Sequence, residues 1–111
     1  MSEIKHITET KRPAQCTIWK EIDASLYQVM LDKNADYSPY NILGTGEIGC
    51  LVRLWDKVAR LMNLYGLDIT TGELHPAKDP HIKDESIQDT LADLRNYAQI
   101  MMILRTGQWG K

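Results

Sequence analysis

The stretch 84–105 constrains the fold most, because its apolar residues recur with the period of an α-helix. At about 100° per residue, six of them fall on one side of that helix: Ile87, Leu91, Leu94, Ala98, Met101 and Met102. We therefore expect a long helix here that buries this side against another element of the fold.

Acidic residues accompany this apolar side. Glu85 and Asp89 lie one helical turn apart, and Asp93 follows at the edge of the apolar side. Burial of an unpaired carboxylate is costly, so acids near a core need a cationic partner. That partner could be a set of basic side chains on another helix or a divalent metal ion that prefers oxygen ligands.

A second helix is predicted over residues 47–65, and it is apolar around most of its circumference. One broad face holds Ile48, Leu51, Val52, Trp55, Val58, Ala59 and Met62, and Leu54, Leu61 and Leu64 add another. The narrow polar side that remains holds Arg53, Asp56, Lys57 and Arg60. A helix that is apolar on two sides belongs at the centre of a bundle or at a subunit interface.

The remaining segments complete an all-α chain. A first helix is expected over 16–34, where seven residues share one side: Ile18, Trp19, Ile22, Leu26, Val29, Met30 and Lys33. Residues 1–15 are expected to form an N-terminal arm, and 34–45 and 66–83 to form loops. Asp84 or Ser86 would then cap the final helix. We predict a single domain over 16–111, built as a bundle of three to four main helices.

Composition limits the possible partners. With 111 residues and a net charge of −2, the chain lacks the basic surface that duplex nucleic acid requires, but free nucleotides are not excluded. The chain is near the small end of what a monomer stabilises comfortably, so a homo-oligomer, a dimer or a tetramer, is plausible.

No apolar run is long enough to span a membrane, and we expect a cytoplasmic protein. Cys16 and Cys50 are expected to be packing residues in a reducing compartment.

The familiar catalytic motifs are absent from the sequence. The run GTGEIG at 44–49 lacks the Lys-Ser/Thr ending of a phosphate-binding loop, and no strand precedes it. His6, His75 and His81 are scattered and are not expected to be metal ligands. The loop 34–45 is more informative, because Tyr37 and Asn41 offer an aromatic face and hydrogen-bonding groups for a base or sugar. The alternative is that its tyrosines cap the hydrophobic core.

The basic side of the second helix and the acids of the last helix should face each other. In one interpretation, Arg53, Lys57 and Arg60 only neutralise the acids as ion pairs between helices, in a purely structural helical oligomer. In the other, Asp56 joins the acids to bind Mg²⁺, and the basic residues bind phosphate. The spacing alone leaves both open.

Four blocks of sequence resemble the phage and bacterial "nucleotide modification associated domain" family. They are KNADY at 33–37, ILGTGEIG at 42–49, RLWDKVARLMNL at 53–64 and KDESIQDTLADLRNYAQI at 83–100. That family is similar, more distantly, to the all-α nucleoside triphosphate pyrophosphohydrolases of MazG type. The resemblance implies a helical oligomer that binds Mg²⁺ through acids on two consecutive helices. It also implies that nucleoside triphosphates are cleaved to a nucleoside monophosphate and pyrophosphate.

The charge pattern and the resemblance together give a hypothesis with specific roles. In this hypothesis Asp56, Glu85 and Asp89 bind Mg²⁺ and are catalytic, with Asp93 as a weaker metal ligand. Phosphate contacts fall to Arg53, Lys57 and Arg60, and the base or sugar end to Lys33, Asp36, Tyr37 and Asn41. Arg53 and Lys57 stand where the MazG pattern has more acids, which favours holding phosphates over activating water. The alternative function is therefore a protein that binds and sequesters a nucleotide or cyclic nucleotide without turnover.

Overall fold

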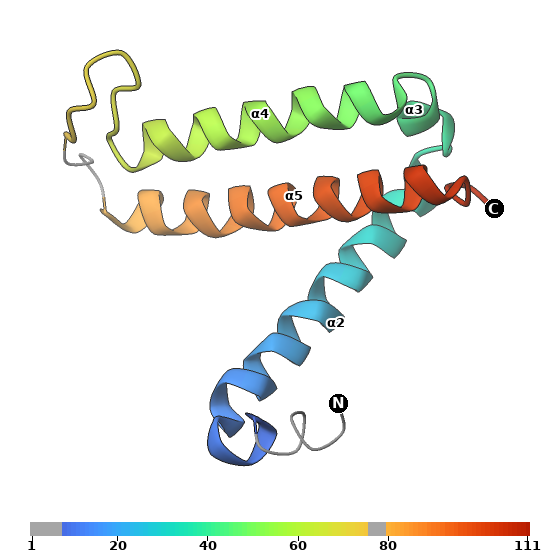
Figure 1. Cartoon of the computed structure of the whole chain (residues 1–111), viewed down its shortest axis with the longest axis horizontal. Coiled ribbons are helices and arrows are strands. Elements are labelled where there is room, and N and C mark those ends of the chain that lie inside the picture. Colours follow the sequence, from blue (N-terminus) through green and yellow to red (C-terminus); the bar gives the residue numbers. More distant parts are fainter. Residues whose placement is uncertain (1–7, 76–79) are drawn as a thin grey trace. The chain divides into compact units, whose positions relative to one another are not determined.

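The computed structural model describes the backbone of residues 8–75 and 80–111 and the side chains of 8–75 and 84–111. It shows an all-α chain, as predicted, whose main helices are α2 (Pro13–Asp36), α4 (Gly46–Leu64) and α5 (Pro80–Thr106) (Figure 1). A short helix, α3 (Tyr40–Leu43), precedes α4. Within the described residues there is no strand, and a search of their helices finds none long and apolar enough to cross a membrane.

The chain divides into two compact units, Met1–Asp36 and Tyr37–Lys111. The first unit is dominated by α2, which is longer at both ends than the predicted helix over 16–34. Pro13 suits a first helical position, because its fixed φ matches the helix and its missing N–H would have had no partner there. Residues 8–11 form a further helical turn, and 1–7 of the predicted arm lie outside the described residues. No residue of α2 is buried.

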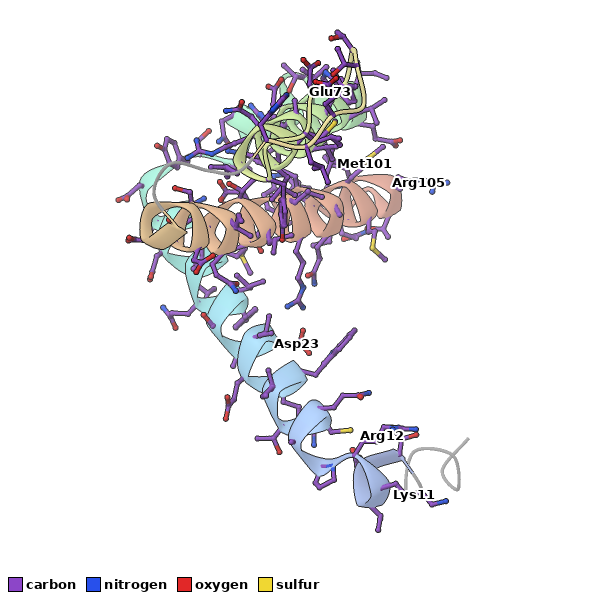
Figure 2. The ribbon with its side chains drawn as sticks, turned by 90° about the vertical axis from the view of Figure 1, so that its left-hand side faces the viewer. Lys11, Arg12, Asp23, Glu73, Met101 and Arg105 are labelled. Atoms are coloured by element: carbon purple, nitrogen blue, oxygen red, sulfur yellow. The ribbon has the colours of Figure 1, made fainter. Side chains whose placement is uncertain are left out.

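The second unit is built on a hairpin of two long helices. α4 and α5 run antiparallel and pack side by side (Figure 1). Cys50 of α4 and Ile87 of α5 are buried, and Met101, labelled in Figure 2, lies on the side of α5 that faces α4. The predicted bounds of α4 were correct to within one residue at each end.

The buried side of α5 differs from the predicted one. Leu91 is 45% exposed and Met102 is 69% exposed, whereas Thr90 is 2% exposed. Burial of Thr90 is inexpensive because its hydroxyl donates to the carbonyl of Ser86 in the same helix, at 2.6 Å. The prediction from apolar residues alone misplaced the centre of the buried side. It did not include Thr90, a polar residue whose hydroxyl has its hydrogen-bond partner within the helix.

The connection between α4 and α5 is shorter than predicted. α5 begins at Pro80, so Asp84 and Ser86 lie inside the helix and the prediction that either one caps it was wrong. Sequence reasoning took the proline as a loop residue, although proline also suits a first helical turn.

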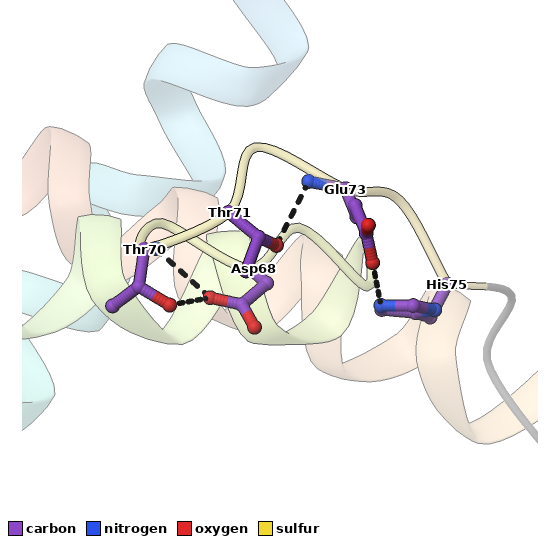
Figure 3. A network of polar contacts seen from close by, with 5 residues as sticks. All are labelled: Asp68, Thr70, Thr71, Glu73 and His75. Atoms are coloured by element: carbon purple, nitrogen blue, oxygen red, sulfur yellow. Dashed lines mark hydrogen bonds and ion pairs between the residues drawn. The ribbon is translucent and has the colours of Figure 1, made fainter.

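Residues 66–75 of this connection form a compact turn closed by an isolated bridge between Leu67 and Leu74. The Asp68 carboxylate accepts hydrogen bonds from the backbone and side chain of Thr70, and these bonds hold its pKa below the usual value (Figure 3). Gly66 has φ +76°, and a Cβ there would collide with the carbonyl of His75, so this position requires glycine.

The predicted loop 34–45 is partly helical. α2 continues to Asp36, and α3 follows after a turn that contains Pro39. Ile42 of α3 is 5% exposed, so the short helix contributes to the small core of the second unit. The C-terminal tail returns to this region, because a Cβ at Gly110 would meet the ring of Pro39 at 2.8 Å.

Replacing Ile87 tests this core. Ile87→Ala should lower the free energy of unfolding by about 2–4 kcal/mol, because it removes buried methyl groups and leaves a cavity in a small core. Ile69, which is 64% exposed, provides the matched control. Ile69→Ala should change the free energy by less than about 0.5 kcal/mol in the same urea titration. Equal effects of the two substitutions would contradict the assignment of Ile87 to the core.

Candidate functional site

One ion pair joins the two long helices. Lys57 Nζ of α4 lies 3.0 Å from Asp93 Oδ2 of α5, and both side chains are about one quarter to one third exposed. This contact is one of the pairs expected if the basic side of α4 and the acids of α5 face each other. The pair lies at the edge of the contact between the helices, where solvent still reaches both groups.

Arg53 lies one turn before Lys57 and makes a second contact with α5. Its guanidinium carbon lies 5.6 Å from the centroid of the Tyr97 ring, a cation–π distance. Its Nη1 atom is buried and finds no hydrogen-bond acceptor among the described residues. A buried guanidinium nitrogen without an acceptor is costly, and an anionic group placed there would relieve that cost.

Cys50 lies one turn before Arg53 and is fully buried. Burial raises the pKa of its thiol, and the positive charge of Arg53 partly offsets that rise. The thiol is therefore protonated at neutral pH and acts as a packing group, as the sequence analysis predicted.

The predicted phosphate and metal residues on α4 do not all share one side. Arg53 and Lys57 are directed toward α5, whereas Asp56 and Arg60 are exposed. Asp56 lies about 100° around the helix from Lys57, because each residue turns the chain by that angle. The polar side expected on α4 is thus split between the contact with α5 and the solvent.

On α5, Glu85 and Asp89 are exposed and form no ion pair with a described residue. Within residues 8–75 and 84–111, no three His, Cys, Asp or Glu side chains lie close enough together to hold a metal ion. Among the described residues of α5, Glu85 and Asp89 are two exposed carboxylates one turn apart. That set matches the one or two protein carboxylates that Mg²⁺ usually takes, with water or phosphate oxygens completing its coordination.

The residues predicted for the base or sugar belong to both units. Lys33 and Asp36 lie in the last turn of α2, in the first unit. Tyr37, which is 59% exposed, and Asn41, which is on α3, belong to the second. The four residues are thus divided between the two units.

Sequence reasoning did not identify Tyr97 as a partner of Arg53. The signal was available, because Arg53 precedes Lys57 by four residues and Tyr97 follows Asp93 by four. In an antiparallel helix pair, one contact between Lys57 and Asp93 implies the other one turn along. The sequence alone does not show that Lys57 contacts Asp93, and without that contact the register of α4 against α5 is unknown.

A double-mutant cycle would measure the ion pair. Lys57→Met and Asp93→Asn should show a coupling free energy of about 0.5 kcal/mol, because the pair is partly exposed and screened. Thermal unfolding of the wild type, both single variants and the double variant gives this value. Lys20 and Glu9, an exposed pair at 3.6 Å, provide the control cycle with a smaller expected coupling. A coupling of zero between Lys57 and Asp93 would contradict the contact.

The burial of Cys50 predicts its reactivity. At pH 8, a disulfide reagent should modify Cys16 first and Cys50 on the order of tenfold more slowly, because burial shields that thiol and raises its pKa. A Cys50→Ala variant should lack the slow phase, and Cys16→Ser should lack the fast one. Because burial raises the pKa of Cys50 in the folded protein, its ionisation disfavours the folded state from the pKa of the unfolded thiol upward. Stability should therefore fall as the pH rises from that pKa through the raised pKa of the folded thiol, and Cys50→Ala should remove this part of the fall.

Comparison of the chain with models of protein families, with curated proteins and with solved structures gives no match.

Proposed function

We propose that this protein acts on free nucleotides as a Mg²⁺-dependent (deoxy)nucleoside triphosphate pyrophosphohydrolase. In this proposal it is a MazG-like helical oligomer that releases a nucleoside monophosphate and pyrophosphate, in the nucleotide metabolism of a phage-infected cell. Support comes from the ordered sequence blocks between residues 33 and 100 and from the charged groups of α4 and α5. The low net charge fits a small anionic substrate better than a duplex.

One observation carries the proposal. Arg53 is held against Tyr97, and its buried Nη1 finds no acceptor among the described residues. A planar guanidinium fixed in this way is suited to bidentate binding of a phosphate, and phosphate oxygens are the acceptors that Nη1 lacks. In this proposal Lys57, one turn further along α4, adds positive charge for the same group, and Arg60 is an outer contact.

The two exposed acids of α5 suit the metal. Glu85 and Asp89 would hold Mg²⁺ together with phosphate oxygens of the substrate. Bound Mg²⁺ would neutralise phosphate charge and favour attack by water on a phosphoryl group. Asp93 is the weaker ligand, because it already lies 3.0 Å from Lys57.

Binding without turnover is the second candidate function, and a specific observation favours it. No group of three acids forms among the described residues of the chain, and the charge of Lys57 is partly neutralised by Asp93. Such a site would hold phosphates more readily than it would activate water. The protein would then sequester a nucleotide or a cyclic nucleotide and release it intact.

Incubation of the full chain with each dNTP and Mg²⁺ tests the first candidate, with the products resolved by ion-exchange chromatography. We expect a nucleoside monophosphate and pyrophosphate from at least one triphosphate. Asp89→Asn should lower that rate by at least about tenfold without loss of fold, since Asp89 is exposed. Glu73→Gln, a change of the same kind at a side chain that is 67% exposed on the turn, should leave the rate unchanged.

The same proteins distinguish the other functions. A thermal shift with an intact nucleotide that is never hydrolysed, and that is lost in Arg53→Gln, would support sequestration, since a ligand of the folded state raises its stability. The purely structural alternative predicts no shift with any nucleotide, with or without Mg²⁺. That result would exclude both nucleotide functions.

A further inference from the structure

Four side chains form a contact cluster between α4 and α5, which we call the inter-helix cluster: Arg53, Lys57, Asp93 and Tyr97. Lys57 Nζ lies 3.0 Å from Asp93 Oδ2, and the guanidinium carbon of Arg53 lies 5.6 Å from the centroid of the Tyr97 ring. Residues four apart on a helix are neighbours on its surface, so the two contacts lie one turn from each other. The cluster therefore combines two cations and one carboxylate along a short stretch of the hairpin.

The carboxylate of the inter-helix cluster pairs with only one of the two cations. Asp93 Oδ2 lies 3.0 Å from Lys57 Nζ, whereas Arg53 Nη1 is buried and has no hydrogen-bond acceptor among the described residues. The internal anion thus pairs with the partly exposed lysine and leaves the buried nitrogen of Arg53 without an acceptor. A phosphate that enters the cluster therefore finds one cation available and the other already paired.

Lys57 is the group for which two anions compete. In the proposed function it contacts the phosphate that Arg53 binds. The Cβ atoms of the two basic residues are about 5–6 Å apart, as for any pair four residues apart on a helix, so the long lysine side chain reaches a group held by Arg53. Asp93 and the phosphate are alternative partners of one ammonium group. Both side chains of the existing pair are about one quarter to one third exposed, and such a pair is weak enough to exchange.

We propose that Asp93 is an internal competitor of the phosphate ligand, which holds Lys57 in the absence of ligand and is replaced there when phosphate binds. The inference rests on the proposed function, because it requires phosphate at Arg53. The ligand class it favours is a chain of linked phosphates, which contacts the Arg53 fork and Lys57 at the same time. Because the competitor is part of the protein, the affinity is lower than the two cations alone would give, and release of pyrophosphate is favoured.

Titration calorimetry of the full chain with inorganic pyrophosphate tests the competition, in a buffer that contains EDTA and about 0.15 M salt. Asp93→Asn should bind pyrophosphate about three- to tenfold more tightly than the wild type, because Lys57 no longer has a charged partner. Arg53→Gln should bind it more weakly, since it removes the guanidinium fork. Asp93→Ala, which leaves Lys57 no acceptor at this position and suits a helix, repeats the test if Asp93→Asn does not fold.

Two controls show whether the gain acts through Lys57. In a Lys57→Met background, the gain from Asp93→Asn should fall to about twofold or less, because the competed group is absent. Asp84→Asn makes the same change at an exposed carboxylate of α5. It lies roughly 13 Å from Asp93 along the helix axis, beyond the screening length of about 8 Å, so the affinity should change by less than about 1.5-fold.

The outcomes separate this inference from the proposed function. Pyrophosphate binding that is lost in Arg53→Gln but not strengthened in Asp93→Asn or Asp93→Ala would overturn the role of Asp93 and leave the proposed phosphate site in place. An equal gain with and without Lys57 would also overturn it, since Asp93 would then act only through its charge. No binding by any of these proteins would overturn the phosphate site and this inference with it.

Discussion

The register between α4 and α5 is the constraint on which the rest of the second unit depends. Lys57 contacts Asp93, and one turn away Arg53 lies over the ring of Tyr97. Both contacts obey the same antiparallel register, so each fixes the other. A shift by one residue would rotate these side chains by about 100° and would place charged groups where Cys50 and Ile87 are now buried.

This register explains why the basic side chains of α4 and the acidic side chains of α5 have different environments. Arg53 and Lys57 are on the side of α4 that packs against α5, so they are partly buried and held by specific neighbours. In the same register, Asp89 lies level with Leu61 of α4. The hairpin therefore holds Arg53 and Lys57 against α5 and leaves Glu85 and Asp89 exposed.

The sequence predicted the helices well because their periodicity is a local property. The apolar period located α2, α4 and α5, with errors at helix ends such as Pro80 that depend on single residues. The buried side of α5 was less predictable, since Thr90 enters the core only because its hydroxyl bonds to the carbonyl of Ser86. Likewise, the apolar residues of α4 do not reveal which of two sides meets α5. That choice depends on long-range packing, and it places Trp55 in solvent and Cys50 in the core.

For the candidate site, the sequence could give the residue types but not their grouping. Asp56 and Lys57 are adjacent in sequence, yet Lys57 packs against α5 while Asp56 is exposed, because neighbouring residues on a helix point in different directions. The same geometry leaves some charged groups without a partner among the described residues. Glu85 and Asp89 are like charges one turn apart without an ion pair among the described residues, an arrangement that costs a few tenths of a kcal/mol in a helix. In the proposed function, a divalent cation would offset that repulsion, and a phosphate would give the buried nitrogen of Arg53 the acceptor it lacks.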